Sequence, residues 1–191
     1  AKVITARELL RYGDRTAGSQ LASQRARRVM PMGVASSFQN YDPHPIVVRN
    51  ARGAYMEDVD GHRYIDFSMG FGALFAGHAN PIVRSAVEAQ LGDGTLFVTP
   101  SEINAEVAEL LVARFGLPMW RFTNSGTEAT MDAIRVARGV TGRDKIVKVE
   151  GGYHGHHDEV MVSMKPPLHL AGPADAPNTV PATAGITAAV L

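Results

Sequence analysis

The stretch from Met119 to Val140 constrains the fold most strongly, because an apolar run, a short polar turn and a helical pattern follow one another there. Residues 119–123 place large side chains alternately on two faces, as a buried or half-buried strand does. Beyond the turn, apolar residues recur at spacings of three and four, which predicts one apolar stripe along a helix. The stripe consists of Ala129, Ala133, Val136, Ala137 and Val140. We therefore expect a strand, a turn and a helix.

The turn itself, Ser125-Gly126-Thr127, is a candidate phosphate-binding site. The first backbone N–H groups of a helix have no partner inside it, and the aligned peptide dipoles favour an anion at this end. Gly126 lets a bulky oxyanion approach the backbone, and the hydroxyls of Ser125 and Thr127 can donate hydrogen bonds. The alternative is that Ser125 or Thr127 only caps the helix.

A second strand is predicted at residues 145–149, after a short turn. A strand, a helix and a strand with short loops form a βαβ unit, whose sheet is parallel and whose ligand sites lie at the carboxyl ends of the strands. The Ser125-Gly126-Thr127 turn and the loop with Tyr153 and His154 both follow such ends. We expect them to face one crevice.

The first 68 residues predict an N-terminal helical arm and a small antiparallel meander. Thr5 and Glu8 have the spacing of a capping box, and a second helical run covers about residues 19–30. Asp60-Gly61 is a strong hairpin signal between short strand-like runs. These runs cover residues 46–48, 54–58 and 63–67.

Residues 69–164 are expected to be the first part of a large domain with a mostly parallel sheet flanked by helices, so the fold class is α/β. The apolar, glycine-rich residues 69–78 predict a buried or cleft-lining loop. Asn80 and Pro81 are expected to open one helix, and a capping box from Thr99 to Glu102 to open the next, with a buried apolar stripe. That stripe is Ile103, Val107, Leu110 and Leu111.

Residues 165–191 are rich in proline, glycine and alanine, and predict a long loop without an element of its own. Two parallel strands are too few for a finished domain. We therefore expect this segment to be a loop and truncated end. We expect the chain as a whole to be an incomplete part of a larger fold.

Composition excludes several classes of protein. The 191 residues are 45% hydrophobic and 20% charged, and positive and negative side chains balance, so no field points to nucleic acid or an anionic membrane. The lack of cysteine excludes disulfides and thiolate metal sites and fits a reducing compartment. No apolar run approaches the length of a membrane span, and the first residues lack a signal-peptide core. We expect a cytoplasmic protein without membrane or nucleic-acid partners.

Four stretches in fixed order resemble one family. They are residues 59–66, 77–81, 124–131 and 137–146, the last leading to Tyr153-His154-Gly155-His156. Together they resemble the class III aminotransferases of pyridoxal phosphate (PLP) fold type I, most closely the glutamate-1-semialdehyde 2,1-aminomutase branch. The resemblance spans about residues 30–162.

The resemblance implies pyridoxal 5′-phosphate as the cofactor, with its phosphate on Ser125, Gly126 and Thr127, its ring stacked on Tyr153, and His154 beside the ring. The alternative for Tyr153 is packing in the core with its hydroxyl satisfied. The histidines of residues 154–157 with Asp158 could instead bind a metal, but a glycine-bearing loop offers no obvious fourth ligand, so we expect no metal site.

Two departures from the family bear on activity. The family needs a lysine that forms a Schiff base with the cofactor, and none of Lys2, Lys145, Lys148 and Lys165 matches its motif, so we expect no catalytic residue in this chain. Gln39 stands where the aminomutases bind the substrate carboxylate with arginine, and Phe71 near their tryptophan. A neutral amide cannot form the bidentate ion pair that arginine gives a carboxylate.

These substitutions favour an aminotransferase that moves an amino group between an amine or amino acid and a keto acid, with Gln39 and Phe71 contacting substrate. The alternatives are an aminomutase, which moves the amino group within one molecule, and a non-catalytic cofactor-binding fragment. The resemblance also implies a homodimer.

Overall fold

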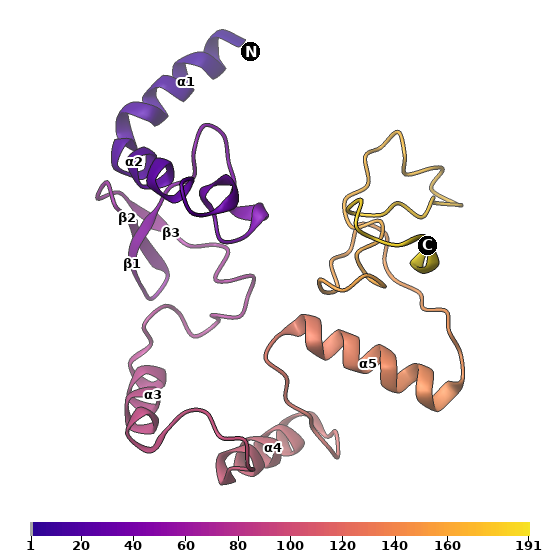
Figure 1. The fold of residues 1–191 in the computed structure, drawn as a ribbon. Helices are drawn as coiled ribbons and strands as arrows, with labels where there is room; N and C mark the ends of the chain where they lie inside the picture. Colours follow the sequence, from indigo (N-terminus) through magenta and orange to yellow (C-terminus); the bar gives the residue numbers. More distant parts are fainter. Residues whose placement is uncertain (1) are drawn as a thin grey trace. The chain divides into compact units, whose positions relative to one another are not determined.

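The computed structural model describes residues 2–191, and the chain divides into two compact units that meet at the Thr99–Pro100 peptide bond (Figure 1). Each unit is described by itself. None of the helices within residues 2–191 has the length and apolar character needed to cross a bilayer.

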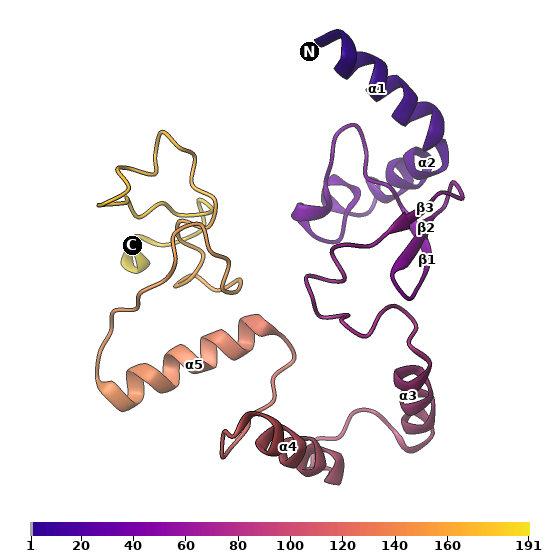
Figure 2. The same ribbon diagram turned by 180° about the vertical axis from the view of Figure 1, so that it is seen from behind.

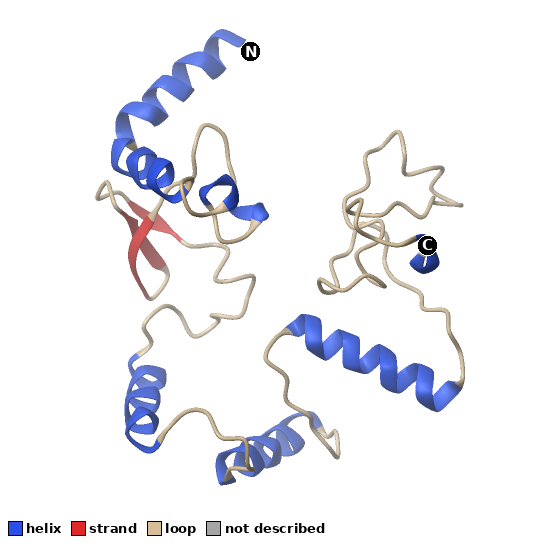
Figure 3. Ribbon diagram, viewed as in Figure 1, coloured by secondary structure: helices blue, strands red, loops and turns tan. Residues whose placement is uncertain are grey.

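The N-terminal unit contains helices and one small sheet. Its elements are α1 (Lys2–Arg15), α2 (Ala17–Ala26), η1 (Pro31–Gly33), η2 (Ser37–Gln39), β1 (Val48–Arg52), β2 (Tyr55–Asp58), β3 (Arg63–Ile65) and α3 (Pro81–Asp93). The strands pair antiparallel in the order β1-β2-β3, which confirms the predicted arm and meander (Figure 3). The first strand was predicted at residues 46–48 and lies at Val48–Arg52, and α2 ends at Ala26 instead of near residue 30. Helix α1 is already formed before Thr5, so the predicted capping box there is wrong. Asn80 caps α3 as predicted, because Ile82 N–H donates to its Oδ1 at 3.0 Å.

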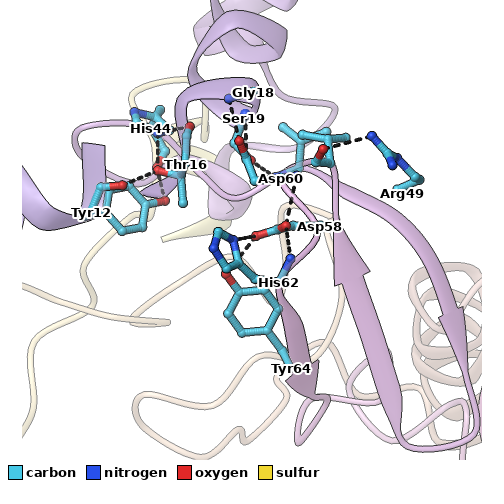
Figure 4. A network of polar contacts seen from close by, with 12 residues as sticks. Tyr12, Thr16, Gly18, Ser19, His44, Arg49, Asp58, Asp60, His62 and Tyr64 are labelled. Atoms are coloured by element: carbon cyan, nitrogen blue, oxygen red, sulfur yellow. Dashed lines mark hydrogen bonds and ion pairs between the residues drawn. The ribbon is translucent and has the colours of Figure 1, made fainter. Parts of the chain in front are cut away.

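A polar network links the hairpin to the helical arm (Figure 4). The carboxylate of Asp60, in the β2–β3 turn, accepts from Gly18 N–H at 2.6 Å and from Ser19 N–H at 2.9 Å, at the start of α2. The side chain of Thr16, the residue before α2, makes no capping bond. A residue about forty positions further along the chain therefore satisfies the N-terminus of this helix.

The centre of the same network is Asp58, whose side chain is fully buried. It accepts from His62 N–H at 2.8 Å, Asp60 N–H at 3.0 Å and the Tyr64 hydroxyl at 2.8 Å, and His62 Nδ1 lies 3.1 Å away. Burial alone would raise the pKa of Asp58, but these hydrogen bonds outweigh it and the pKa is lowered. Burial, with the bond to Asp58, raises the pKa of Tyr64 to about 12.

The C-terminal unit is built on two helices. Its elements are α4 (Glu102–Phe115), α5 (Gly126–Thr141) and the short η3 (Ala188–Val190). Both predicted helices are confirmed, but α4 begins after Ser101, so the capping box predicted from Thr99 is wrong. Each helix ends at a glycine with a left-handed backbone, Gly116 at φ 69° and Gly142 at φ 66°, the conformation that glycine adopts most easily.

The two strands predicted on either side of α5 are absent from the part of the chain that the structure describes. Residues 119–123 and 145–149 run without ladder hydrogen bonds, so the expected parallel βαβ unit is not formed. A strand is defined by pairing with a neighbour, and neither segment has a neighbouring strand within this unit. Helix α5 does form, because its backbone hydrogen bonds are internal to the segment.

Residues 160–191 fold back on themselves. The side chains of Val160, Met161 and Ile186 are buried. Ala182 N–H donates to Met161 O at 3.0 Å, and Val162 and Pro181 form an isolated antiparallel β-bridge. The predicted loop is therefore mostly correct, but η3 is a short element of its own that the sequence did not predict.

Three apolar segments are exposed, although the stripe on α4 was predicted to be buried and the loop of residues 69–78 to be buried or to line a cleft. On α4, Ile103 is 46% exposed and Leu110 70%, and on α5 Val136 is 65% exposed. In the loop of residues 69–78, Phe71 is 81% exposed. The helical periodicity of α4 and α5 is as predicted, but these apolar side chains stay largely exposed within their own unit.

Candidate functional site

The N-terminus of α5 combines a helix cap with accessible hydroxyl groups. Ser125 has extended backbone angles and its Oγ accepts from Glu128 N–H at 3.2 Å, while the Glu128 carboxylate accepts from Asn124 N–H at 2.6 Å. Ser125 is therefore a cap, the alternative that the sequence left open. It is exposed together with Gly126, and Thr127 is half-buried. A serine that accepts through Oγ can still donate its own hydrogen, so capping does not exclude anion binding.

The loop with Tyr153 and His154 lies against this end of α5, as the two views show (Figures 1 and 2). His156 N–H donates to Thr127 Oγ1 at 3.1 Å. Gly155 is buried in the contact: a Cβ there would lie 3.2 Å from Thr127 Cα and 2.8 Å from Thr130 Oγ1. The two segments that the sequence predicted to meet are in contact within one unit.

Tyr153 and His154 differ in their surroundings. Tyr153 is 60% exposed, so its ring is accessible and the alternative of packing in the core does not hold within this unit. His154 is half-buried and its Nε2 is buried without a hydrogen-bond partner among the described residues. Such a nitrogen is an unused donor or acceptor, because buried polar groups are normally paired.

A series of side-chain contacts, which the sequence did not predict, holds the same loop against α5. His157 Nε2 lies 3.3 Å from Thr130 Oγ1, and His157 Nδ1 lies 2.9 Å from Glu159 Oε2. Glu159 also forms an ion pair with Arg138 of α5, with 3.4 Å between Glu159 Oε1 and Arg138 Nη1. The hydrogen bond from His157 is the main cause that lowers the pKa of Glu159. The only sequence signal was the cluster of polar residues after Tyr153, which gives no partners.

The N-terminus of α5 and the adjoining loop bring hydroxyl groups and an aromatic ring to one place. Apart from neighbouring residues and the backbone of α5 itself, no atom lies within 4 Å of the position that a Cβ of Gly126 would take, and the hydroxyl-bearing Ser125 and Thr127 stand on either side of it in the chain. The accessible ring of Tyr153 stands on the adjoining loop. Within residues 2–191 no group of three or more metal-ligating side chains is positioned to hold an ion.

Gln39 and Phe71, the predicted substrate residues, belong to the N-terminal unit. Phe71 packs edge-on against Phe38 with ring centroids 5.3 Å apart. Gln39 Oε1 accepts from Ser36 N–H at 3.2 Å and so closes the capping box of η2. Their role toward substrate stays a prediction.

Comparison with known proteins gives matches over most of this chain. A family model described as aminotransferase class-III matches residues 36–183. The chain is 46% identical over 164 residues to a glutamate-1-semialdehyde 2,1-aminomutase of Archaeoglobus fulgidus, which covers 85% of this chain and 38% of that protein.

Solved structures give matches of the same extent. An omega-transaminase from Sphaerobacter thermophilus aligns with a TM-score of 0.84 at 41% identity, over 90% of this chain and 39% of that one. A glutamate-1-semialdehyde aminomutase variant from Pseudomonas aeruginosa, in complex with PMP, aligns with a TM-score of 0.83 at 33% identity, over 97% of this chain and 39% of that one. This chain spans less than half the length of these relatives.

Proposed function

The chain belongs to the class III aminotransferase family, and we propose that it provides the phosphate and ring contacts for pyridoxal 5′-phosphate in a PLP-dependent aminotransferase. The α/β fold class predicted from the sequence is confirmed, since the helices and small antiparallel sheet match the N-terminal part of fold type I transaminases. The observation that carries the proposal is the contact between the two loops, with His156 N–H donating to Thr127 Oγ1 at 3.1 Å.

Ser125, Gly126 and Thr127 would hold the phosphate. A phosphate gains from the partial positive charge and the free N–H groups at the start of a helix, and two hydroxyls add donors that strengthen when the acceptor is ionised. Helix α5 has 16 residues, long enough for a full helix dipole. The PMP in the Pseudomonas aeruginosa structure supports a B6 phosphate as the ligand.

Tyr153 would stack on the cofactor ring, and His154 would lie beside it. Offset stacking between aromatic rings contributes about 0.5–1.5 kcal/mol beyond the area buried. The accessible ring of Tyr153 and the unpaired Nε2 of His154 are compatible with these roles.

Pyridoxal phosphate, when bound, supplies an electron sink that stabilises negative charge at the substrate Cα. The residues of this chain bind and orient that group. None of the chain's lysines matches the family's motif, so the covalent attachment and the proton transfer at Cα are assigned to a residue outside the 191 positions. The activity is therefore proposed for the whole protein.

We favour intermolecular amino transfer between an amine or amino acid and a keto acid, because Gln39 cannot pair with a carboxylate as arginine does. Phe71 keeps an aromatic wall without an N–H donor. The second candidate is the glutamate-1-semialdehyde aminomutase reaction, favoured by the 46% identity to the Archaeoglobus fulgidus protein.

The test is the dependence on an external keto acid, measured with the whole protein loaded with pyridoxal phosphate. An aminotransferase stops after one half-reaction with amine donor alone and resumes when keto acid is added. Conversion of glutamate 1-semialdehyde without any keto acid would show the aminomutase. No amino transfer under either condition, with cofactor bound, would leave the non-catalytic alternative.

We further propose a cytoplasmic homodimer. The lack of cysteine and of a predicted membrane segment supports the compartment, and the family resemblance supports the dimer. Light scattering of the whole protein measures the second point directly.

A further inference from the structure

The loop with Tyr153 and His154 is attached to α5 through a series of side-chain contacts that begins and ends on the helix. It runs from Thr130 through His157 and Glu159 to Arg138, with contacts of 3.3, 2.9 and 3.4 Å. Thr130 and Arg138 are about two helical turns apart. The loop is therefore held at two places along α5 by groups outside the proposed cofactor contacts.

Glu159 fixes the hydrogen-bonding role of His157 Nδ1. An ionised carboxylate only accepts, so His157 Nδ1 carries the hydrogen and donates it to Glu159 Oε2. The lowered pKa of Glu159 keeps this acceptor ionised at neutral pH. The side chain of His157 is 9% exposed and that of Glu159 38%, so the hydrogen bond between them is partly buried. The Arg138 contact is half-exposed and contributes less.

The backbone leaves the loop little freedom to sit elsewhere on the helix. Gly155 is buried and has no room for a Cβ between Thr127 Cα and Thr130 Oγ1. His157 follows two residues later, so the imidazole fixes the loop just beyond the closest backbone approach. The spacing between Thr127 and Tyr153 depends on both contacts.

We propose that His157 and Glu159 are positioning residues that set the spacing between the Ser125-Gly126-Thr127 turn and the loop with Tyr153 and His154. A ligand that has both a phosphate and an aromatic ring gains from this spacing, because its two binding surfaces are ordered before it arrives. Inorganic phosphate needs the turn alone and gains nothing. The identity of the ligand rests on the proposed function.

The test compares two probes on the purified chain by equilibrium dialysis. Pyridoxamine 5′-phosphate (PMP) reports on both surfaces, and its amine cannot condense with the chain's lysines as an aldehyde would. Inorganic phosphate reports on the turn. In His157→Ala we expect the dissociation constant of pyridoxamine phosphate to rise about five- to tenfold, as for one or two lost hydrogen bonds, and that of phosphate to stay within about twofold.

His169→Ala is the matched control, because His169 is exposed and outside the chain of contacts. It should change neither constant. Glu159→Gln keeps an acceptor without the charge and should give a smaller, selective loss. The double variant His157→Ala with Glu159→Gln should lose no more than His157→Ala, since Glu159 acts through the imidazole.

Far-UV circular dichroism checks that each variant keeps its helices, and Glu159→Gln carries the test if His157→Ala does not fold. Equal weakening of both probes would overturn the inference in favour of a merely structural role, and so would unchanged binding of both in the variants. A wild-type chain that binds neither probe would overturn the proposed function itself. Binding by wild type with no selective loss overturns the positioning role alone.

Discussion

Ser125 serves the helix and can still serve a ligand. Its Oγ accepts from Glu128 N–H, and its hydroxyl hydrogen remains available to an anion on the exposed side. The cap could be predicted from the sequence because the cap residue and the helix it starts are contiguous. The cap of α2 could not, because Asp60 reaches it from a distant hairpin. Neighbouring residues determine the first, and tertiary contacts the second.

Ser125→Ala should lower the free energy of unfolding by about 1 kcal/mol, the usual value of an N-cap. Urea unfolding followed by far-UV circular dichroism measures it. Ser125→Asn is the control, since asparagine caps helices as well, and should retain most of the stability. An alanine variant as stable as wild type would show that the 3.2 Å bond to Glu128 N–H contributes nothing in solution.

At the level of elements, the helices and the local hairpin were predicted well. Strands that must pair with a segment distant in the sequence were predicted poorly. Helix α5 closes its hydrogen bonds within Gly126–Thr141, and the β2–β3 hairpin pairs across a short turn. Residues 119–123 and 145–149 carry strand-like patterns, but a pattern cannot supply the neighbouring strand. The contact between the two loops could be predicted in spite of this, since both adjoin one end of α5.

The meander has a titration signature. Burial and the hydrogen bond to Asp58 raise the pKa of Tyr64 to about 12, so its phenol should ionise well after ordinary tyrosines near pH 10. Because the folded pKa exceeds the unfolded one, the contact stabilises the fold below about pH 10, and that contribution is lost as the pH rises through 12.

Ultraviolet titration of the five tyrosines should therefore show a late component near pH 12 that Tyr64→Phe removes and Asp58→Asn moves to lower pH. Burial raises the pKa of Tyr12 as well, and that contribution should remain in Tyr64→Phe. Tyr41→Phe is a control at an exposed residue and should leave the late component in place. A titration in which all tyrosines ionise together would contradict the buried contact with Asp58.

At the scale of the whole molecule, each unit carries its own predicted features but leaves apolar faces uncovered. Val136 and Val140, which belong to the predicted apolar stripe of α5, are 65% and 82% exposed. The sequence encodes such a face through its periodicity, but the residues that cover it belong to the rest of the fold. The match to the Archaeoglobus fulgidus relative covers 38% of that protein. The proposed cofactor contacts need fewer distant segments, since the turn of residues 125–127 and the loop with Tyr153 and His154 already adjoin within the C-terminal unit.

Backbone amide chemical-shift mapping with pyridoxamine 5′-phosphate tests the central claim most directly, since it reports where on the chain the ligand binds. The account predicts that the largest shifts fall on Gly126, Thr127 and Glu128 and on Tyr153 and His154, and that they follow one binding curve. Shifts confined to other parts of the chain, or on only one of the two loops, would contradict it.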